Sequence, residues 1–206
     1  MVKIKICGIT NLEDALLAAE LGADALGFIF YAKSPRHVAP ETARSIIAQL
    51  PPFVAAVGVF VDEAAAVVQE LAARVGLDWV QLHGQESPEY CRNLGCKVIK
   101  AFRIKDEGSL RMLADYQGAA QALLLDTYKK GQMGGTGEIF DWHLARKAKK
   151  YGHIILAGGL TSENVAMAIA TALPMAVDAA SGTEAAPGKK DPAKLRAFFE
   201  AVRSEQ

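Results

Sequence analysis

The chain has 206 residues and a mass of 22.0 kDa, so residues 1–206 are expected to form a single domain with a substantial core. Lysine and arginine total 23, as do aspartate and glutamate, so overall charge does not favour nucleic acid or an anionic membrane as a partner. No apolar run approaches the roughly 20 residues of a membrane span, and we expect no signal peptide because strand-like sequence begins at Val2.

Apolar β-type runs alternate with segments of helical periodicity along the whole chain. The runs predict eight strands: Val2–Ile6, Ala25–Phe30, Val54–Val59, Trp79–Leu82, Lys97–Phe102, Ala122–Leu125, Ile154–Leu156 and Met175–Val177. The intervening segments predict helices at Leu12–Leu21, Pro40–Gln49, Glu63–Val75, Pro88–Leu94, Phe140–Lys150, Ser162–Ala172 and Pro192–Arg203, with a weaker one at Glu107–Ala114. This order predicts an α/β fold with a parallel sheet.

About 26 residues per strand–helix unit fits a compact single-domain (β/α)8 barrel, a TIM barrel. If one short strand is miscounted, an open doubly wound sheet fits instead. Three predicted helices begin with capping signals: Thr10/Asn11, Thr161/Ser162, and Asp191 followed by Pro192.

Reactive groups of such barrels lie at the C-terminal ends of the strands and in the loops that follow. Polar residues interrupt the apolar runs at those places: Cys7-Gly8, Phe30 to Arg36, His83-Gly84, Phe102-Arg103, Asp126, Gly158-Gly159 and Ser181-Gly182. We therefore expect these residues to surround one mouth of the barrel.

Two of these residues have side chains suited to acid–base catalysis. Cys7 ends the first predicted strand and, as a thiolate, is a candidate base. Asp126 ends the sixth, and a carboxyl in a poorly solvated mouth holds its proton to higher pH and serves as a general acid. Structural alternatives remain open, since free cysteines are often small buried hydrophobes and an aspartate here also suits a helix N-cap or a loop salt bridge.

A phosphate site is indicated after the last two predicted strands. Gly158 and Gly159 follow the seventh strand and precede a helix, and Ser181 and Gly182 follow the eighth. Glycines let backbone N–H groups approach an anion, and these two loops are the usual phosphate site of such barrels. The alternative is ordinary turn chemistry.

Two further segments have less specific patterns. Gly134, Gly135, Thr136 and Gly137 lack the Lys-Ser/Thr ending of a Walker A loop, so they predict either a mobile loop over the mouth or a simple connector. Arg36 could hold a carboxylate by a two-pronged contact, or be an ordinary surface arginine.

The cysteine and histidine pattern argues against a metal site. Cys91 and Cys96 are too far apart for zinc-ligand spacing, and the four histidines are scattered. Only His83 lies at a strand end, where we expect it to bind substrate by donating a hydrogen bond rather than to bind metal. Three cysteines are a sparse, odd set, which is typical of a cytoplasmic protein rather than a disulfide framework.

The chain resembles the phosphoribosylanthranilate isomerases, enzymes of tryptophan biosynthesis, over essentially its whole length. The resemblance lies in eight ordered blocks: residues 5–10, 27–30 with 34–36, 58–61, 80–84, 125–126, 134–137 with 140–142, 156–160, and 181–184 with 187–188 and 190–191. In this family the matching cysteine is the general base, the matching aspartate the general acid, and the matching arginine holds the anthranilate carboxylate, which implies these roles for Cys7, Asp126 and Arg36. Thr183 stands where the family usually has valine, with little effect expected.

The resemblance implies an aldose–ketose isomerase that rearranges N-(5-phosphoribosyl)anthranilate by Amadori chemistry, without a cofactor, as a monomer or homodimer. Two other enzyme readings fit less well: indole-glycerol-phosphate synthase needs a lysine acid where Cys7 and Val59-Phe60 stand, and a pentose-phosphate epimerase needs metal ligands. A non-catalytic sensor of a phosphorylated metabolite would keep the glycine loops but has no need for both Cys7 and Asp126.

Overall fold

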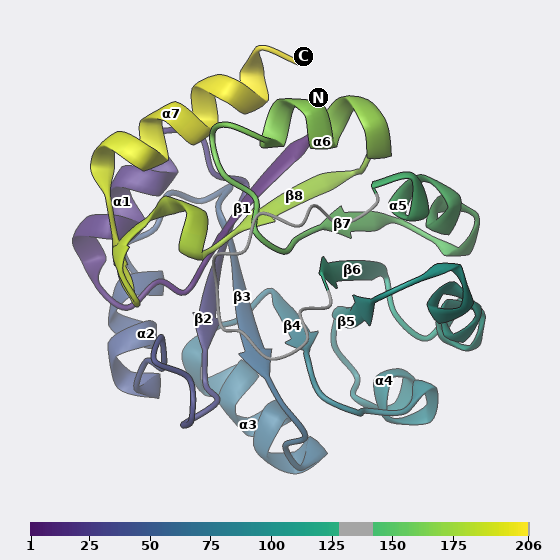
Figure 1. The fold of residues 1–206 in the computed structure, drawn as a ribbon. Coiled ribbons are helices and arrows are strands. Elements are labelled where there is room, and N and C mark those ends of the chain that lie inside the picture. The colour runs from purple at the N-terminus through teal and green to yellow at the C-terminus, as the bar shows by residue number, and fades with distance from the viewer. Residues whose placement is uncertain (128–141, 206) are drawn as a thin grey trace.

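Eight parallel strands close into a barrel in chain order, with helices around the outside (Figure 1). The structure is a computed structural model that describes residues 1–127 and 142–205, so the predicted loop at Gly134–Gly137 lies outside the described residues. The strands are β1 Lys3–Cys7, β2 Ala25–Ile29, β3 Ala55–Phe60, β4 Trp79–Leu82, β5 Val98–Ile104, β6 Ala122–Thr127, β7 Ile154–Leu156 and β8 Ala176–Ala179. The predicted (β/α)8 barrel is confirmed and the open sheet is wrong.

The α-helices in the described part of the chain mostly follow the predicted order. They are α1 Leu12–Glu20, α2 Pro40–Ile47, α3 Ala65–Val75, α4 Pro88–Asn93, α5 Trp142–Ala148, α6 Val165–Ala172 and α7 Pro192–Arg203. Asn11 and Asp191 cap α1 and α7 as predicted, each accepting from backbone N–H groups of the first turn. The predicted start of α6 is wrong: the helix begins after Asn164, whose side chain accepts from the N–H of Thr161.

Two elements differ in kind from the prediction. The weak helix after β5 is a 3₁₀ helix, η1 (Glu107–Tyr116), capped reciprocally by Asp106 and Ser109. After β8 the chain forms a short 3₁₀ turn, η3 (Ser181–Thr183), and a small hairpin of β9 (Glu184–Ala186) and β10 (Lys189–Lys190), which the sequence pattern did not predict. A second 3₁₀ turn, η2 (Lys149–Tyr151), extends α5.

Strands β5, β6 and β8 are longer than predicted at their C-terminal ends. The parallel ladder between β5 and β6 continues through Arg103 opposite Asp126 and Ile104 opposite Thr127. A polar side chain ends an apolar run in the sequence, but it does not interrupt backbone pairing. Asp126 and Asp178 therefore lie inside strands rather than after them.

Alternation along β1 sets which side chains face the interior. Ile4 and Ile6 belong to the large apolar core between strands and helices, whereas Lys5 and Cys7 occupy the opposite face, inside the barrel. A smaller apolar cluster, which includes Val57, Ala101, Leu124 and Ile155, fills part of that interior. The barrel is thus packed, with polar groups concentrated at particular interior positions.

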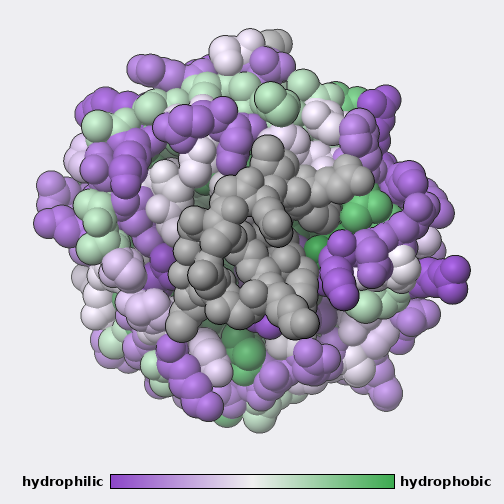
Figure 2. Space-filling view, in the orientation of Figure 1, coloured by the Kyte–Doolittle hydropathy of each residue, from purple (hydrophilic) through white to green (hydrophobic). Residues whose placement is uncertain are grey.

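The face shown in Figure 2 carries mainly hydrophilic side chains around its edge, with small, scattered hydrophobic areas. Among the described residues, no helix is long and apolar enough to cross a membrane.

Candidate active site

Cys7 is buried at the C-terminal end of β1, between β2 and β8. Its partner in β2 is Gly27, and a Cβ placed on that glycine would lie 2.7 Å from the Cys7 sulfur and 3.1 Å from the Lys5 Nζ. The thiol and the Lys5 ammonium therefore share the space above Gly27, which only a residue without a side chain leaves open.

Lys5 forms a buried ion pair with Asp178 across the interface between β1 and β8. The Nζ–Oδ1 distance is 2.8 Å. Sequence analysis missed both residues, although the signal was available for Lys5, since residues two apart on a strand face the same side. Asp178 gave a weaker signal, a carboxylate among alanines and a valine.

The surroundings of Cys7 act on its ionisation in opposite directions. Burial raises the pKa of the Cys7 thiol above its ordinary value of 9.0, because the thiolate loses solvation. Lys5 and, more weakly, Lys190 lower that pKa, whereas the carboxylate of Asp178 raises it.

Asp126, near the C-terminal end of β6, and His83, directly after β4, lie close together at the mouth of the barrel. Neither strand is a neighbour of β1. The Nε2 of His83 is 3.6 Å from the Oδ2 of Asp126, with both side chains partly exposed. Behind them, the Nε2 of Gln81 is 3.2 Å from the Nδ1 of His83. Gln81, which sequence analysis also missed, is 2% exposed and its Oε1 has no hydrogen-bond partner among the described residues.

Arg36 makes a two-pronged contact with a carboxylate of the protein itself. Its Nε and Nη2 donate to Glu184 at 2.8 and 2.7 Å. This hydrogen bonding raises the pKa of Arg36, and although burial opposes the charge on Glu184, Arg36 and Lys190 lower the pKa of that carboxyl. Gly8, with φ of 81°, admits the arginine, because a Cβ there would lie 2.8 Å from the Arg36 Cδ.

Lys190 joins this pair to the end of β1. Its ammonium is fully buried and donates to the carbonyl oxygens of Cys7 at 2.7 Å and Ala180 at 3.1 Å, and it lies 3.4 Å from Glu184. Burial lowers the pKa of Lys190, and Glu184 opposes that effect. The β9–β10 hairpin thereby connects Cys7, Arg36 and the loop after β8.

The two predicted phosphate loops lie against one another. Gly158 and Gly159 both have positive φ, 86° and 67°. A Cβ on Gly182 would overlap the carbonyl oxygen of Leu160, so the loop after β8 packs directly on the loop after β7. The two glycine loops that the sequence predicts as a phosphate site therefore lie in contact with each other.

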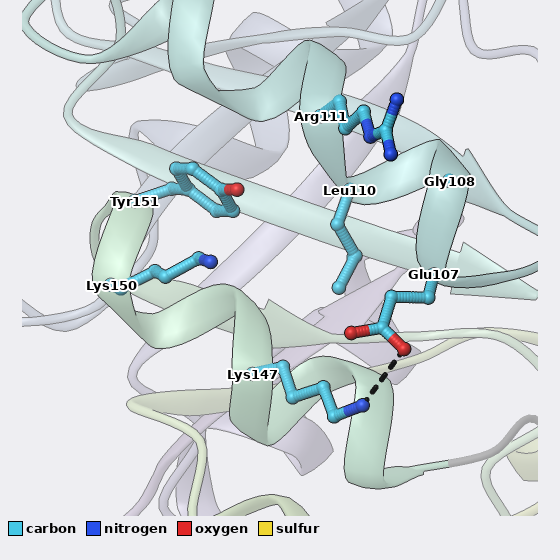
Figure 3. A pocket seen from close by; sticks show the side chains of 7 residues that line it. All are labelled: Glu107, Gly108, Leu110, Arg111, Lys147, Lys150 and Tyr151. Atoms are coloured by element: carbon cyan, nitrogen blue, oxygen red, sulfur yellow. Dashed lines mark hydrogen bonds and ion pairs between the residues drawn. The ribbon is translucent and has the colours of Figure 1, made fainter.

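Outside the mouth, a groove of about 650 Å³ lies on the outer layer between η1 and α5 (Figure 3). It is lined by Glu107, Gly108, Leu110, Arg111, Lys147, Lys150 and Tyr151, and Lys147 pairs with Glu107 at 2.9 Å across it. It contains none of the predicted site residues. Within residues 1–127 and 142–205, His, Cys, Asp and Glu form no group of three or more that could hold a metal ion.

A family model and curated relatives show which family the chain belongs to. The sequence model described as N-(5'-phosphoribosyl)anthranilate (PRA) isomerase matches residues 4–201. The N-(5'-phosphoribosyl)anthranilate isomerase of Citrifermentans bemidjiense is 56% identical over 196 residues, covering 95% of this chain and 94% of that protein. The corresponding protein of Geobacter metallireducens is 53% identical over 204 residues, covering 99% and 100%.

Solved structures agree. The phosphoribosyl anthranilate isomerase of Thermotoga maritima superposes with a TM-score of 0.94 at 46% identity, covering 99% of this chain and 100% of that one. Another such isomerase, solved with reduced 1-(o-carboxyphenylamino)-1-deoxyribulose 5-phosphate, has a TM-score of 0.90 at 44% identity, with the same coverage. A further structure from Thermotoga maritima concerns monomers generated from an isomerase described as dimeric.

Proposed function

This chain belongs to the N-(5'-phosphoribosyl)anthranilate isomerases, enzymes of tryptophan biosynthesis, and we propose that Cys7 and Asp126 carry out the proton transfers of the reaction. The observation that carries the assignment is the arrangement of the mouth. A thiol on β1 and a carboxyl on β6 stand on strands that are not neighbours, and the glycine loops after β7 and β8 lie between them in barrel order. This arrangement supports the proposal that an acid and a base act on one phosphorylated substrate from different sides of the barrel mouth.

Ring opening is the step assigned to Asp126. The protonated carboxyl donates its proton to the furanose ring oxygen, the C1–O bond breaks, and the lone pair of the anthranilate nitrogen forms a Schiff base with C1. The Nε2 of His83, 3.6 Å from the carboxyl of Asp126, is the neighbouring group assigned to orient it.

Proton abstraction is the step assigned to Cys7. The thiolate takes the proton from C2 of the opened ribose, so that an S–H bond forms as the C–H bond breaks. The electron pair moves into a C1–C2 double bond and neutralises the Schiff-base nitrogen, giving an enolamine. The enolamine gains a proton at C1 and loses its hydroxyl proton at C2 to become the aminoketose. The substrate's own nitrogen is the electron sink, so the reaction requires no cofactor.

Substrate binding is assigned to Arg36 and the glycine loops. Because Glu184 holds the Nε and Nη2 of Arg36, its Nη1 is the nitrogen assigned to the anthranilate carboxylate. Backbone N–H groups of Gly158, Gly159, Ser181 and Gly182 are assigned to the phosphate. The threonine at 183 is buried and bonds the carbonyl of Ala180, so it shapes the loop rather than contacting phosphate.

Turnover of freshly made N-(5-phosphoribosyl)anthranilate by the purified protein, with a chelator present, tests the assignment. We expect conversion to the aminoketose phosphate without added metal. A folded protein that binds the reduced product analogue but does not turn over substrate would instead support the sensor of a phosphorylated metabolite.

We propose that the chain assembles as a homodimer and acts in the cytoplasm. The support is the isomerase of Thermotoga maritima that is described as dimeric, and Phe53, 97% exposed in the connection between α2 and β3, is the residue we assign to the contact with a second copy. The three cysteines are free, as in reducing compartments. Light scattering is expected to give twice the 22.0 kDa chain mass for the wild type and the chain mass itself for Phe53→Ser. A wild type at the chain mass would contradict the dimer.

A further inference from the structure

The barrel interior holds a buried ion pair that the acid–base steps above do not use. Lys5 is 3% exposed and Asp178 is 8% exposed, and their charged atoms lie 2.8 Å apart. Moving two charges out of water costs about as much as their attraction returns, so stability alone gives little reason for such a pair in a packed interior. The neighbouring interior positions are apolar, among them Ala176 and Val57.

The ammonium of this pair lies beside the Cys7 thiol. Lys5 and Cys7 are two residues apart on β1 and face the same side, and Lys5 is the register partner of Asp178 on β8. The missing side chain at Gly27 lets the ammonium and the sulfur meet, each about 3 Å from the position that a Cβ would take.

Other charged groups also face Cys7, but Lys190 and Arg36 donate to partners other than the sulfur. Lys190, on β10, binds the carbonyl of Cys7 and pairs with Glu184. Arg36, in the loop after β2, is held by the same glutamate. Lys5 is thus the cation placed at the sulfur itself, with Asp178 as its anchor.

We propose that Lys5, anchored by Asp178, is a positioning residue that increases the thiolate fraction of Cys7. The inference rests on the proposed function, because the thiolate is the base assigned to the C2 proton. Lys5 remains protonated throughout, and the proton from C2 goes to the sulfur. Although burial opposes the charge on Lys5, Asp178 and the Cys7 thiolate outweigh it and raise the pKa of the ammonium, so its charge persists at neutral pH.

The two members of the pair act on Cys7 with opposite sign, which makes the proposal testable. Lys5→Met keeps the length of the side chain and removes the positive charge, so the thiol pKa is expected to rise by about one unit or more. Asp178→Asn keeps the shape and removes the negative charge, so the thiol pKa is expected to fall. If the pair only stabilised the fold, the two substitutions would not move the thiol pKa of Cys7 in opposite directions.

The readout is alkylation of Cys7 by iodoacetamide as a function of pH, followed by mass spectrometry of the Cys7 peptide. In Lys5→Met we expect the pH midpoint of Cys7 alkylation to move upward, so that alkylation at pH 7 is roughly tenfold slower. We expect kcat to fall in parallel while KM stays unchanged. Lys3→Met is the matched control, since Lys3 lies two residues earlier on β1 and is exposed in a pair with Asp24. Its midpoint should equal that of the wild type.

Lys5→Met leaves the carboxylate of Asp178 buried without its partner, which can prevent folding. The double variant Lys5→Met/Asp178→Leu removes that unpaired charge and is therefore measured as well. It is expected to show a smaller upward shift than Lys5→Met, because a raising and a lowering influence are lost together. Unshifted midpoints in the folded variants would overturn the inference even where turnover is normal. Loss of wild-type turnover is measured separately and would overturn the proposed function instead.

Discussion

Cys7→Ser is expected to lower kcat by roughly 10²–10⁴-fold while KM changes little. A serine hydroxyl has nearly the shape of the thiol but is a much weaker acid, so no anionic base forms near neutral pH. Because Cys7 is buried at the end of β1, a substituent of similar size leaves the packing beside Gly27 intact. Steady-state kinetics with freshly made N-(5-phosphoribosyl)anthranilate measure both constants.

Cys96→Ser provides the matched control. Cys96 is a free, half-buried cysteine in the connection before β5, and its replacement should leave kcat unchanged. Near-normal turnover in Cys7→Ser would remove the base assignment from Cys7.

Asp126→Asn is expected to lower kcat by a similar factor of roughly 10²–10⁴, since an amide cannot donate a proton to the ring oxygen. The amide keeps the size of the carboxyl and still offers an oxygen to His83, so the end of β6 should keep its shape. Binding of the reduced product analogue, measured by calorimetry, is expected to persist, which separates lost chemistry from lost affinity.

Asp115→Asn is the control for this substitution, because Asp115 is an exposed aspartate on η1. It should retain full activity. If Asp126→Asn turned over substrate at the wild-type rate, the proton for ring opening would have to come from another group, and His83, its close neighbour, would be examined next.

The order of strands and helices could be predicted from the sequence because it depends on hydrophobic periodicity within each segment. The runs at Trp79–Leu82 and Ile154–Leu156 predicted β4 and β7 to the residue, and Asp191-Pro192 predicted the start of α7. One group of errors, at strand ends, arose where local polarity and backbone pairing disagree. The ends of β6 and β8 were predicted short because Asp126 and Asp178 are polar, although the ladders continue past them.

The candidate site was predictable only in part. The sequence placed the candidate residues at strand ends: Cys7, Arg36, His83, Asp126 and the glycine loops. The structure shows which of them meet: Arg36 lies against Gly8, His83 lies near Asp126, and the loop of Gly182 packs on the loop of Gly159. Their roles stay predictions until the variants are measured. The partners that orient them were missed, and among them Glu184 holds Arg36 from 148 positions away along the chain.

By itself the sequence determined the alternation of strands and helices, the bounds of strands such as β4 and β7, and the presence of reactive groups near the strand ends. All of these follow from periodicities of two and 3.6 residues within one segment. The tertiary structure alone decided which interior charges meet: Lys5 with Asp178, 173 residues apart, and Lys190 with the carbonyl of Cys7, 183 residues apart. The physical reason is closure of the barrel, which pairs β1 with β8 and so joins the two ends of the chain around the thiol.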